Sequence, residues 1–158
     1  MLPILALLAA APAHAQDGQT RVAVVVGLSN YKHLPAETAL PSARKDASAI
    51  ARALQDKAGF DHVFSLVDGQ ATRAGVRALI EHQVAPLLQP DDTFVLYFEG
   101  HGIGADLGTP ILLAHDSTLS NAFEDGLDVN ALANDLKTWV KARNTLIVTD
   151  AVHRDQVD

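Results

Sequence analysis

The stretch that most constrains the fold of this chain is an unbroken run of apolar residues from Phe94 to Phe98. Such a run predicts a strand buried on both faces, as in a parallel sheet covered by helices. The chain then turns polar with the sequence Glu-Gly-His-Gly, in which the histidine is His101. The flanking glycines permit a sharp turn and a close approach to the ring. The sequence therefore places a histidine at the carboxyl end of a core strand, where open α/β sheets bind their ligands.

Strands and helices alternate along the chain. Three further core strands are predicted at 21–27, 62–67 and 145–149, and helices are expected to begin at Ser42, at about Thr72 and at Asp128. The first helix should end before Gly59, and Pro86 should end or kink the second. The segment 102–126 is irregular, and its composition predicts an exposed, mobile loop around a short apolar piece at 110–114. This order predicts an α/β fold with a mainly parallel sheet.

Charge and cysteine content exclude several classes of function. The chain has 158 residues, which favours one domain, and its formal net charge is −7. No basic cluster is present, so nucleic acid and anionic membrane are not expected partners. The sequence contains no cysteine, so the chain supplies no disulfide, no thiolate metal ligand and no cysteine nucleophile.

The N-terminus is interpreted as a targeting segment. An apolar run precedes the small-residue pattern Ala13-His14-Ala15, which is typical of a secretory signal peptide covering residues 1–15. No Lys or Arg precedes that run, and an apolar tail on a cytoplasmic protein is the alternative. The mature domain is then expected to span residues 16–158, in the periplasm or outside the cell. The apolar run is too short for a permanent membrane anchor.

One carboxylate stands out on the first predicted helix. Asp46 falls on the same side as the apolar residues Ala43 and Ile50. A carboxylate on the inward side of a helix needs a partner or a functional role. The alternative is that Asp46 lies at the edge of that side, in the first turn, where the helix dipole favours a negative charge.

The loop after the first strand has neither the Gly-x-Gly-x-x-Gly nor the Gly-Lys-Ser/Thr spacing of phosphate-binding loops. This absence argues against a nucleotide-binding fold.

Four motifs in order resemble the caspase-like family, and most closely its bacterial metacaspase and orthocaspase branch. The motifs are Val-Val-Gly-Leu-Ser-Asn-Tyr, Ala-Arg-Lys-Asp-Ala, Asp-Asp-Thr-Phe-Val-Leu-Tyr-Phe-Glu-Gly-His-Gly and Leu-Ile-Val-Thr-Asp-Ala-Val-His. The likeness covers nearly the whole mature chain, and it implies a three-layer caspase-like fold. The family fold normally continues with at least one more helix and two more strands. We therefore expect a fold that lacks those strands and has an exposed sheet edge open to an edge-strand partner.

The resemblance implies a Cys–His dyad protease in which His101 matches the catalytic histidine. The position of the cysteine is occupied by Val152, and Glu99 stands where the family usually has serine. A valine side chain can neither form a thiolate nor attack a carbonyl. The resemblance also implies an acidic pocket for Arg or Lys, with Asp46 and Asp150 at the matching positions. The alternative is that both aspartates cap local backbone.

Three functions remain open at this point. The first is a pseudoprotease that binds a basic peptide or acts as a regulatory module without cutting. The second is a hydrolase that uses a group of His and Asp side chains to bind a metal or activate water, drawn from His101, His115, Asp116, Asp150 and His153. The third is an active protease whose cysteine has been replaced at Val152. No spacing supports a specific metal or a calcium loop, so no cofactor is predicted.

Overall fold

The computed structural model of the protein describes residues 18–104 and 108–153, with the exception of the His153 side chain. The predicted signal peptide at residues 1–15 lies outside the described residues. No helix in the described part of the chain is long and apolar enough to cross a membrane.

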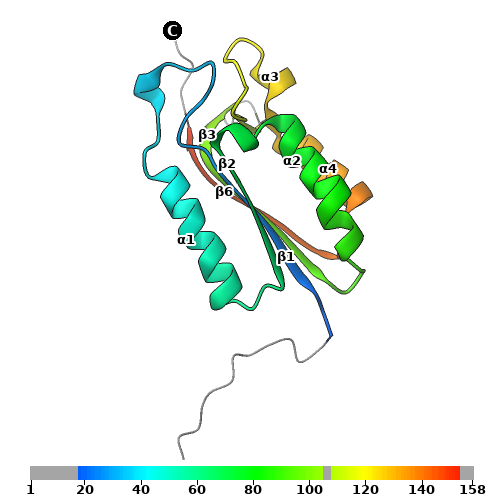
Figure 1. The fold of residues 1–158 in the computed structure, drawn as a ribbon. Coiled ribbons are helices and arrows are strands. Elements are labelled where there is room, and N and C mark those ends of the chain that lie inside the picture. Colours follow the sequence, from blue (N-terminus) through cyan, green and yellow to red (C-terminus); the bar gives the residue numbers. More distant parts are fainter. Residues whose placement is uncertain (1–17, 105–107, 154–158) are drawn as a thin grey trace, which may run out of the picture.

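A sheet with four parallel strands forms the centre of the molecule (Figure 1). Strand β1 (Arg21–Gly27) lies between β2 (His62–Val67) and β3 (Thr93–Ile103), and β6 (Asn144–His153) pairs with β3. Two short antiparallel strands, β4 (Ile111–Leu112) and β5 (Leu127–Asp128), extend the sheet from the last residues of β3. The predicted bounds of β1 and β2 are confirmed, and so is the mainly parallel arrangement.

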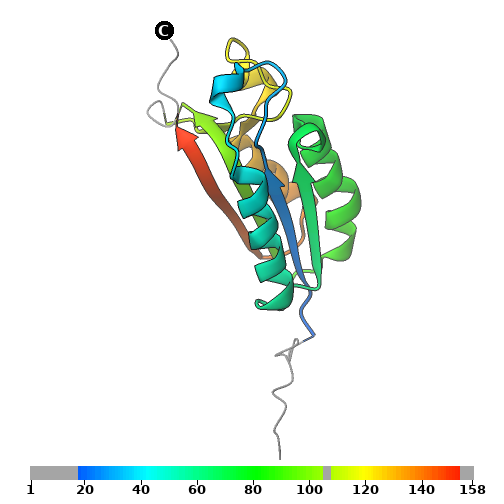
Figure 2. The same cartoon turned by 60° about the vertical axis from the view of Figure 1, so that its left-hand side comes forward.

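Helices cover both faces, which gives the three layers expected from the resemblance. Helix α1 (Ala43–Asp56) lies on one face, and α2 (Arg73–Leu79) and α4 (Val129–Trp139) lie on the other (Figures 1 and 2). After α2 the chain continues as a π turn (Ile80–Val84) and a 3₁₀ turn (Ala85–Leu87), so the helical segment ends around Pro86 as predicted. Short helical turns occur at Ala36–Thr38, at Asp68–Gln70 and in α3 (Ala122–Asp125).

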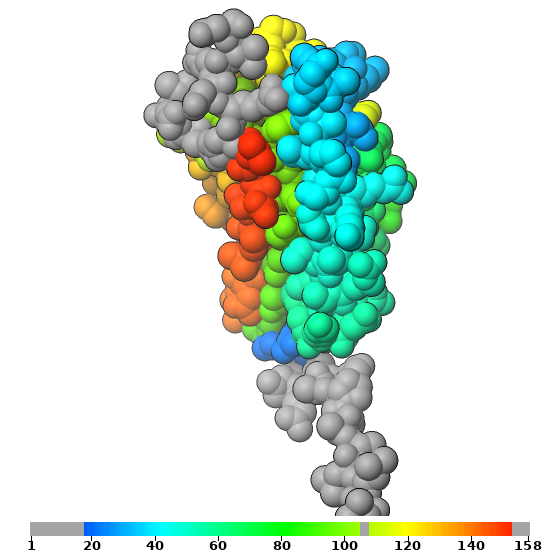
Figure 3. Space-filling model, turned by 90° about the vertical axis from the view of Figure 1, so that its left-hand side faces the viewer, coloured from blue at the N-terminus to red at the C-terminus, as the bar shows by residue number. Residues whose placement is uncertain are grey.

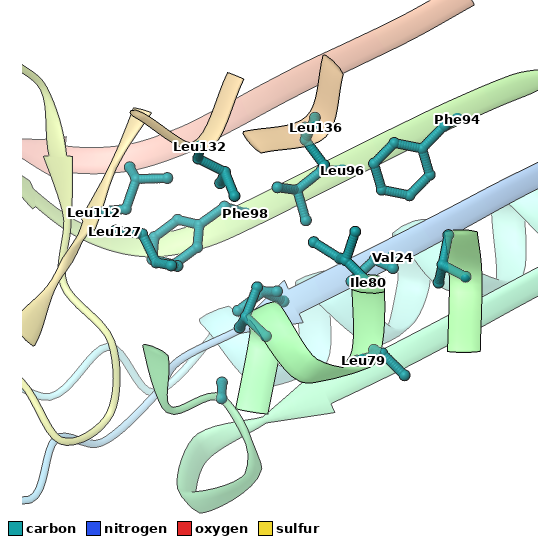
Figure 4. Packing of buried hydrophobic residues seen from close by; sticks show 14 of the residues in the cluster. Val24, Leu79, Ile80, Phe94, Leu96, Phe98, Leu112, Leu127, Leu132 and Leu136 are labelled. Atoms are coloured by element: carbon teal, nitrogen blue, oxygen red, sulfur yellow. The ribbon is translucent and has the colours of Figure 1, made fainter. Parts of the chain in front are cut away.

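The main core lies between the sheet and the two helices of the second face. Alternate residues of β3 point into it, namely Phe94, Leu96 and Phe98, and they are almost fully buried. Leucines of α4 and residues of α2 and its π turn pack against them (Figure 4). The opposite face of β3 therefore presents Tyr97, Glu99 and His101 toward the side of α1, because strand side chains alternate between faces.

Of the two predicted N-caps, Asp128 is confirmed and Ser42 is wrong, and Thr72 caps the helix expected to begin near it. Thr72 accepts a hydrogen bond from the backbone N–H of Gly75, and Asp128 accepts from those of Asn130 and Ala131. Ser42 occupies the N-cap position of α1, but its side chain makes no capping bond. The Ser29 hydroxyl, which lies just beyond β1, accepts the N–H of Arg44 instead. A cap from a distant loop leaves no local sequence signal.

Two other expectations need correction. The strand around Phe98 does not end there, because β3 continues to Ile103 and His101 is itself a strand residue. Pairing with β6 on one side and β4 on the other holds this extension in place. The apolar piece at 110–114 is not exposed, since Ile111 to Ala114 are buried. This piece reaches the core because β4 adds to the sheet.

Strand β6 lies at an edge of the sheet. In the described part of the chain it pairs with β3 alone. Its side chains on the α1 face, Leu146, Val148 and Val152, are exposed. Figure 3 shows β6 uncovered beside β3, with α1 covering the neighbouring part of this face. The expected open edge is therefore present among the described residues.

Candidate functional site

The parallel ladder between β3 and β6 brings the two predicted dyad positions together. His101 pairs directly with Val152, two residues beyond the pair formed by Glu99 and Asp150. Residues that pair directly in neighbouring strands project from the same face of a sheet and lie about 5 Å apart. The side chains of His101 and Val152 therefore leave the same face, side by side. Val152 is 52% exposed, so this position is open to solvent.

His101 is buried and fixed by the loop between β1 and α1. Its Nε2 lies 2.7 Å from the carbonyl oxygen of Thr38, and its backbone N–H donates to the hydroxyl of Tyr31 at 2.7 Å. The Tyr31 and His101 rings also contact each other, with centroids 5.2 Å apart. The histidine is only 2% exposed. Two residues of a single loop thus fix the positions of both the backbone and the ring of His101.

The bond to Thr38 determines the tautomer of His101. A carbonyl oxygen only accepts, so Nε2 must carry the proton that it shares with Thr38. In the neutral ring Nδ1 then holds the free lone pair. Among the described residues Nδ1 has no hydrogen-bond partner, although it is fully buried. A buried and unpaired nitrogen of this kind is what a general base would present to an adjacent nucleophile.

The loop that holds His101 is itself anchored by Asp68 at the end of β2. The Asp68 carboxylate accepts the backbone N–H groups of Ser29 at 2.8 Å and Asn30 at 3.1 Å. Asp68 has a positive φ of 44°, a left-handed conformation that Asp tolerates better than most residues. The ends of β1, β2 and β3 are thereby tied together around His101.

Carboxylates gather beside the histidine on the α1 face. Glu99 is buried and pairs with Asp150 across the β3–β6 ladder. Burial raises the pKa of Glu99 above its ordinary value, and the nearby charges of Asp46 and Asp150 raise that pKa further. Burial and the Glu99 carboxylate also raise the pKa of Tyr97 to about 12. The Tyr97 hydroxyl therefore stays protonated and donates to Glu99 at 3.3 Å.

The position of Asp46 differs from the sequence-based expectation. Ala43 and Ala47 of α1 are buried against the sheet, whereas Asp46 is exposed and so does not belong to the inward stripe. It lies at the margin of the helix, close enough for its charge to act on Glu99 and Tyr97. Asp46, Glu99 and Asp150, called the acidic cluster below, thus come from three different elements. In the sequence, Glu99 is marked only by its departure from serine.

The raised pKa of Glu99 predicts a dependence of stability on pH. Between the ordinary pKa of a glutamate and its raised value, the folded state binds more protons than the unfolded state. The free energy of unfolding should therefore fall as pH rises through that window. Glu99→Gln keeps an acceptor for Tyr97 and removes the charge, so it should stabilise the protein at about pH 7 and have little effect at about pH 3.5.

Urea unfolding of both proteins at the two pH values measures this effect. Glu81→Gln is a matched control, because Glu81 is an exposed carboxylate on the π turn after α2. It should change the unfolding free energy equally at both pH values. Destabilisation by Glu99→Gln at about pH 7 that disappears at about pH 3.5 would show that Glu99 carries a stabilising charge and that the pKa direction is wrong.

Among the described residues, two members of the alternative His/Asp group make contacts within loops. His115 uses Nδ1 to contact the carbonyl oxygen of Asn30, and Asp116 lies 3.4 Å from the backbone N of Arg73. Within residues 18–104 and 108–153, no group of three His, Cys, Asp or Glu residues could hold a metal ion. The side chain of His153 lies outside the description. His115 and Asp116 thus fix loops around the site.

Tyr31 and Thr38 are the site residues that the sequence does not reveal. Tyr31 belongs to one of the motifs that carry the resemblance, but nothing in its type or spacing predicts a contact with His101. Thr38 contributes through its backbone carbonyl, which any residue could supply. A backbone contact between segments more than 60 positions apart leaves no mark in the residue pattern.

Comparisons with known proteins agree with this architecture. A model of the Peptidase_C14 caspase domain matches residues 20–158. Among solved structures, protein GSU0716 from Geobacter sulfurreducens matches with a TM-score of 0.66 and 23% sequence identity. The match covers 87% of this chain and 52% of that one, so the present chain spans about half the length of this neighbour. A search of curated proteins gave no significant match.

Proposed function

Because this chain belongs to the caspase domain family, we propose that it is a catalytically inactive member that binds peptides or proteins through an Arg or Lys side chain. The observation that carries this proposal is the direct pairing of a buried histidine with Val152. The position beside the base holds no group that can attack a carbonyl. No cysteine elsewhere in the sequence can replace it.

The acidic cluster supports a cationic ligand. Glu99 and Asp150 lie opposite each other on neighbouring strands, and the charge of Asp46 acts on the same group. The charges of Asp46 and Asp150 repel that of Glu99 and so raise its pKa. A positive charge placed among the three carboxylates would reduce this repulsion. Asp46 and Asp150 are exposed, so a side chain from solvent can reach them. A guanidinium or ammonium group is the complementary ligand.

A regulatory role in the periplasm or outside the cell is part of the same proposal. It rests on the signal-like N-terminus of the sequence and on the absence of a cysteine nucleophile. A domain that recognises a basic peptide without cutting it would retain the peptide. The open edge of β6, beside the cluster, offers backbone groups to an extended partner strand.

Peptide binding is the direct test. A short peptide with one arginine should bind, and the same peptide with citrulline should bind at least about tenfold more weakly, because citrulline keeps the shape and removes the charge. The double substitution Asp46→Asn and Asp150→Asn should weaken arginine binding by a similar factor. Isothermal titration calorimetry measures both effects. Affinity should also fall as pH is lowered through the raised pKa of Glu99.

A matched control replaces Asp56 by Asn and Glu81 by Gln, which are exposed carboxylates on α1 and after α2. This variant should bind the arginine peptide as the unmodified protein does. Equal binding of arginine and citrulline peptides would refute recognition of the cation. Mass spectrometry of the peptide after prolonged incubation should find it intact, and cleaved peptide would refute inactivity. Cleavage that requires added zinc or calcium would favour the metal-dependent hydrolase instead.

A further inference from the structure

A second candidate site adjoins the loop that holds His101. A pocket of about 540 Å³ opens between that loop, the side of α1 from Arg44 to Arg52, and Asp68, which follows β2. Arg44, Lys45 and Arg52 line it, together with Ser29, Asn30 and Asp68. A volume of this size suits a small molecule. The loop rises above the start of α1 at the carboxyl end of the sheet (Figure 2).

The three cations of the pocket are a local exception in an acidic chain. The formal net charge of the protein is −7, yet Arg44, Lys45 and Arg52 line one cavity. Lys45 and Arg52 are seven positions apart on α1, close to two full turns, so they project from the same side of the helix. None of the three makes an ion pair with a described residue. Unpaired cations around a concave surface attract an anion.

The hydrogen bonds around the pocket show which groups remain for a ligand. The first backbone N–H groups of α1 already donate within the protein, to Leu40, Ser42 and the Ser29 hydroxyl. The Ser29 hydroxyl accepts from Arg44, so its own proton remains available as a donor. Recognition must therefore come from side chains, two guanidinium groups and one ammonium group, rather than from the helix backbone. Each guanidinium group can donate two parallel hydrogen bonds to two oxygens of one phosphate.

One carboxylate in the pocket, that of Asp68, repels an anionic ligand. Asp68 lines the pocket, but its Oδ1 accepts the N–H groups of Ser29 and Asn30. Three positive charges still outweigh one negative charge. We propose that this pocket binds a phosphate dianion, either free or as the monoester of a small organic molecule. This proposal does not depend on cation binding by the acidic cluster or on the inactivity of the dyad positions.

The pocket and the histidine share one loop. Asn30 lines the pocket, and the hydroxyl of the next residue, Tyr31, accepts the backbone N–H of His101. Ala39 lines the pocket, and the carbonyl of the preceding residue, Thr38, accepts from the His101 ring. A ligand that contacts Ser29, Asn30 and Arg44 would restrain this loop, so occupancy of the pocket and the position of His101 are thermodynamically linked.

Nuclear magnetic resonance titration of the ¹⁵N-labelled protein tests the site. Sodium phosphate is added at constant ionic strength set with sodium chloride, because exposed cations are screened by salt. Saturable shifts should centre on the amides of Ser29, Asn30 and Arg44, and a shift of the His101 resonance should follow the same curve. A second titration uses glycerol 3-phosphate and a third uses glycerol. Tighter binding of the ester than of phosphate identifies the ester as the ligand type, and the reverse identifies the free ion.

A charge-matched pair of variants gives the decisive comparison. Arg44→Gln with Arg52→Gln should weaken phosphate binding by about tenfold or more. Lys57→Gln with Lys141→Gln removes the same charge from exposed positions outside the pocket and should leave binding unchanged. The absence of saturable shifts with both phosphate and the ester, or equal weakening in the two variants, would overturn the proposal. Thermal unfolding of each variant verifies that it is folded.

Discussion

Replacing Val152 with cysteine is expected to create a nucleophile that attacks arginine-directed electrophiles. The thiol would stand directly beside His101 in the β3–β6 ladder, on a position that is open to solvent. The free Nδ1 of the histidine would accept its proton, since Nε2 is already committed to Thr38. A positioned base contributes about 10²–10⁴-fold to such reactions.

An arginyl chloromethyl ketone is the appropriate probe, because it combines the cation that the acidic cluster should bind with an electrophile. The rate of alkylation, followed by intact-protein mass spectrometry, should be about 10²-fold higher for Val152→Cys than for a control thiol. Val148→Cys supplies that control, because Val148 is exposed on the same strand and the same face, four residues from the site. Hydrolysis of an arginine peptide by Val152→Cys is the corresponding catalytic readout.

A second substitution assigns the effect to the histidine. His101→Ala in the Val152→Cys protein should reduce the alkylation rate to that of Val148→Cys. Equal rates for Val152→Cys and Val148→Cys would refute the geometry of a retained base beside position 152. Rapid alkylation without peptide hydrolysis would show that the base is retained and that a further requirement for hydrolysis is missing, with Glu99, which occupies the place of a serine in the family motif, as the first position to test.

Gly100→Ala is expected to destabilise the fold by about 1–3 kcal/mol, because it overpacks the contact that holds His101. A Cβ at position 100 would lie 2.6 Å from the Tyr31 hydroxyl and 3.0 Å from the Phe98 ring. The Tyr31 hydroxyl cannot withdraw without losing the N–H of His101, to which it is bonded. The glycine before the histidine thus allows a close approach, as the sequence suggests, and the approaching group is a tyrosine hydroxyl.

A double-mutant cycle with Tyr31→Phe measures this clash. Removal of the hydroxyl takes away the nearest atom, so Gly100→Ala should cost less in the Tyr31→Phe background than in the unmodified protein. Gly69→Ala is the control, because the nearest atom to its added Cβ lies 3.9 Å away. Urea unfolding gives all the free energies. Identical costs of Gly100→Ala in both backgrounds would show that the hydroxyl does not limit the space.

The sequence by itself determined the elements whose formation depends on local pattern. The β-branched run of β1 and the apolar run that starts β3 favour buried strands, and the predicted ends of β1 at Arg21 and Gly27 are those of the structure. Thr72 and Asp128 mark helix starts because each satisfies nearby N–H groups within its own turn. The order of these elements was sufficient to predict a parallel sheet with helices on both faces.

Only the tertiary structure decided how the site is assembled. The extension of β3 through His101 depends on pairing with β4 and β6, and the environment of Glu99 depends on charges from α1 and β6. The carbonyl of Thr38 and the hydroxyl of Tyr31 reach His101 from a loop more than 60 positions away. Contacts between segments so far apart in the chain follow from packing and strand register, which residue type and spacing do not encode.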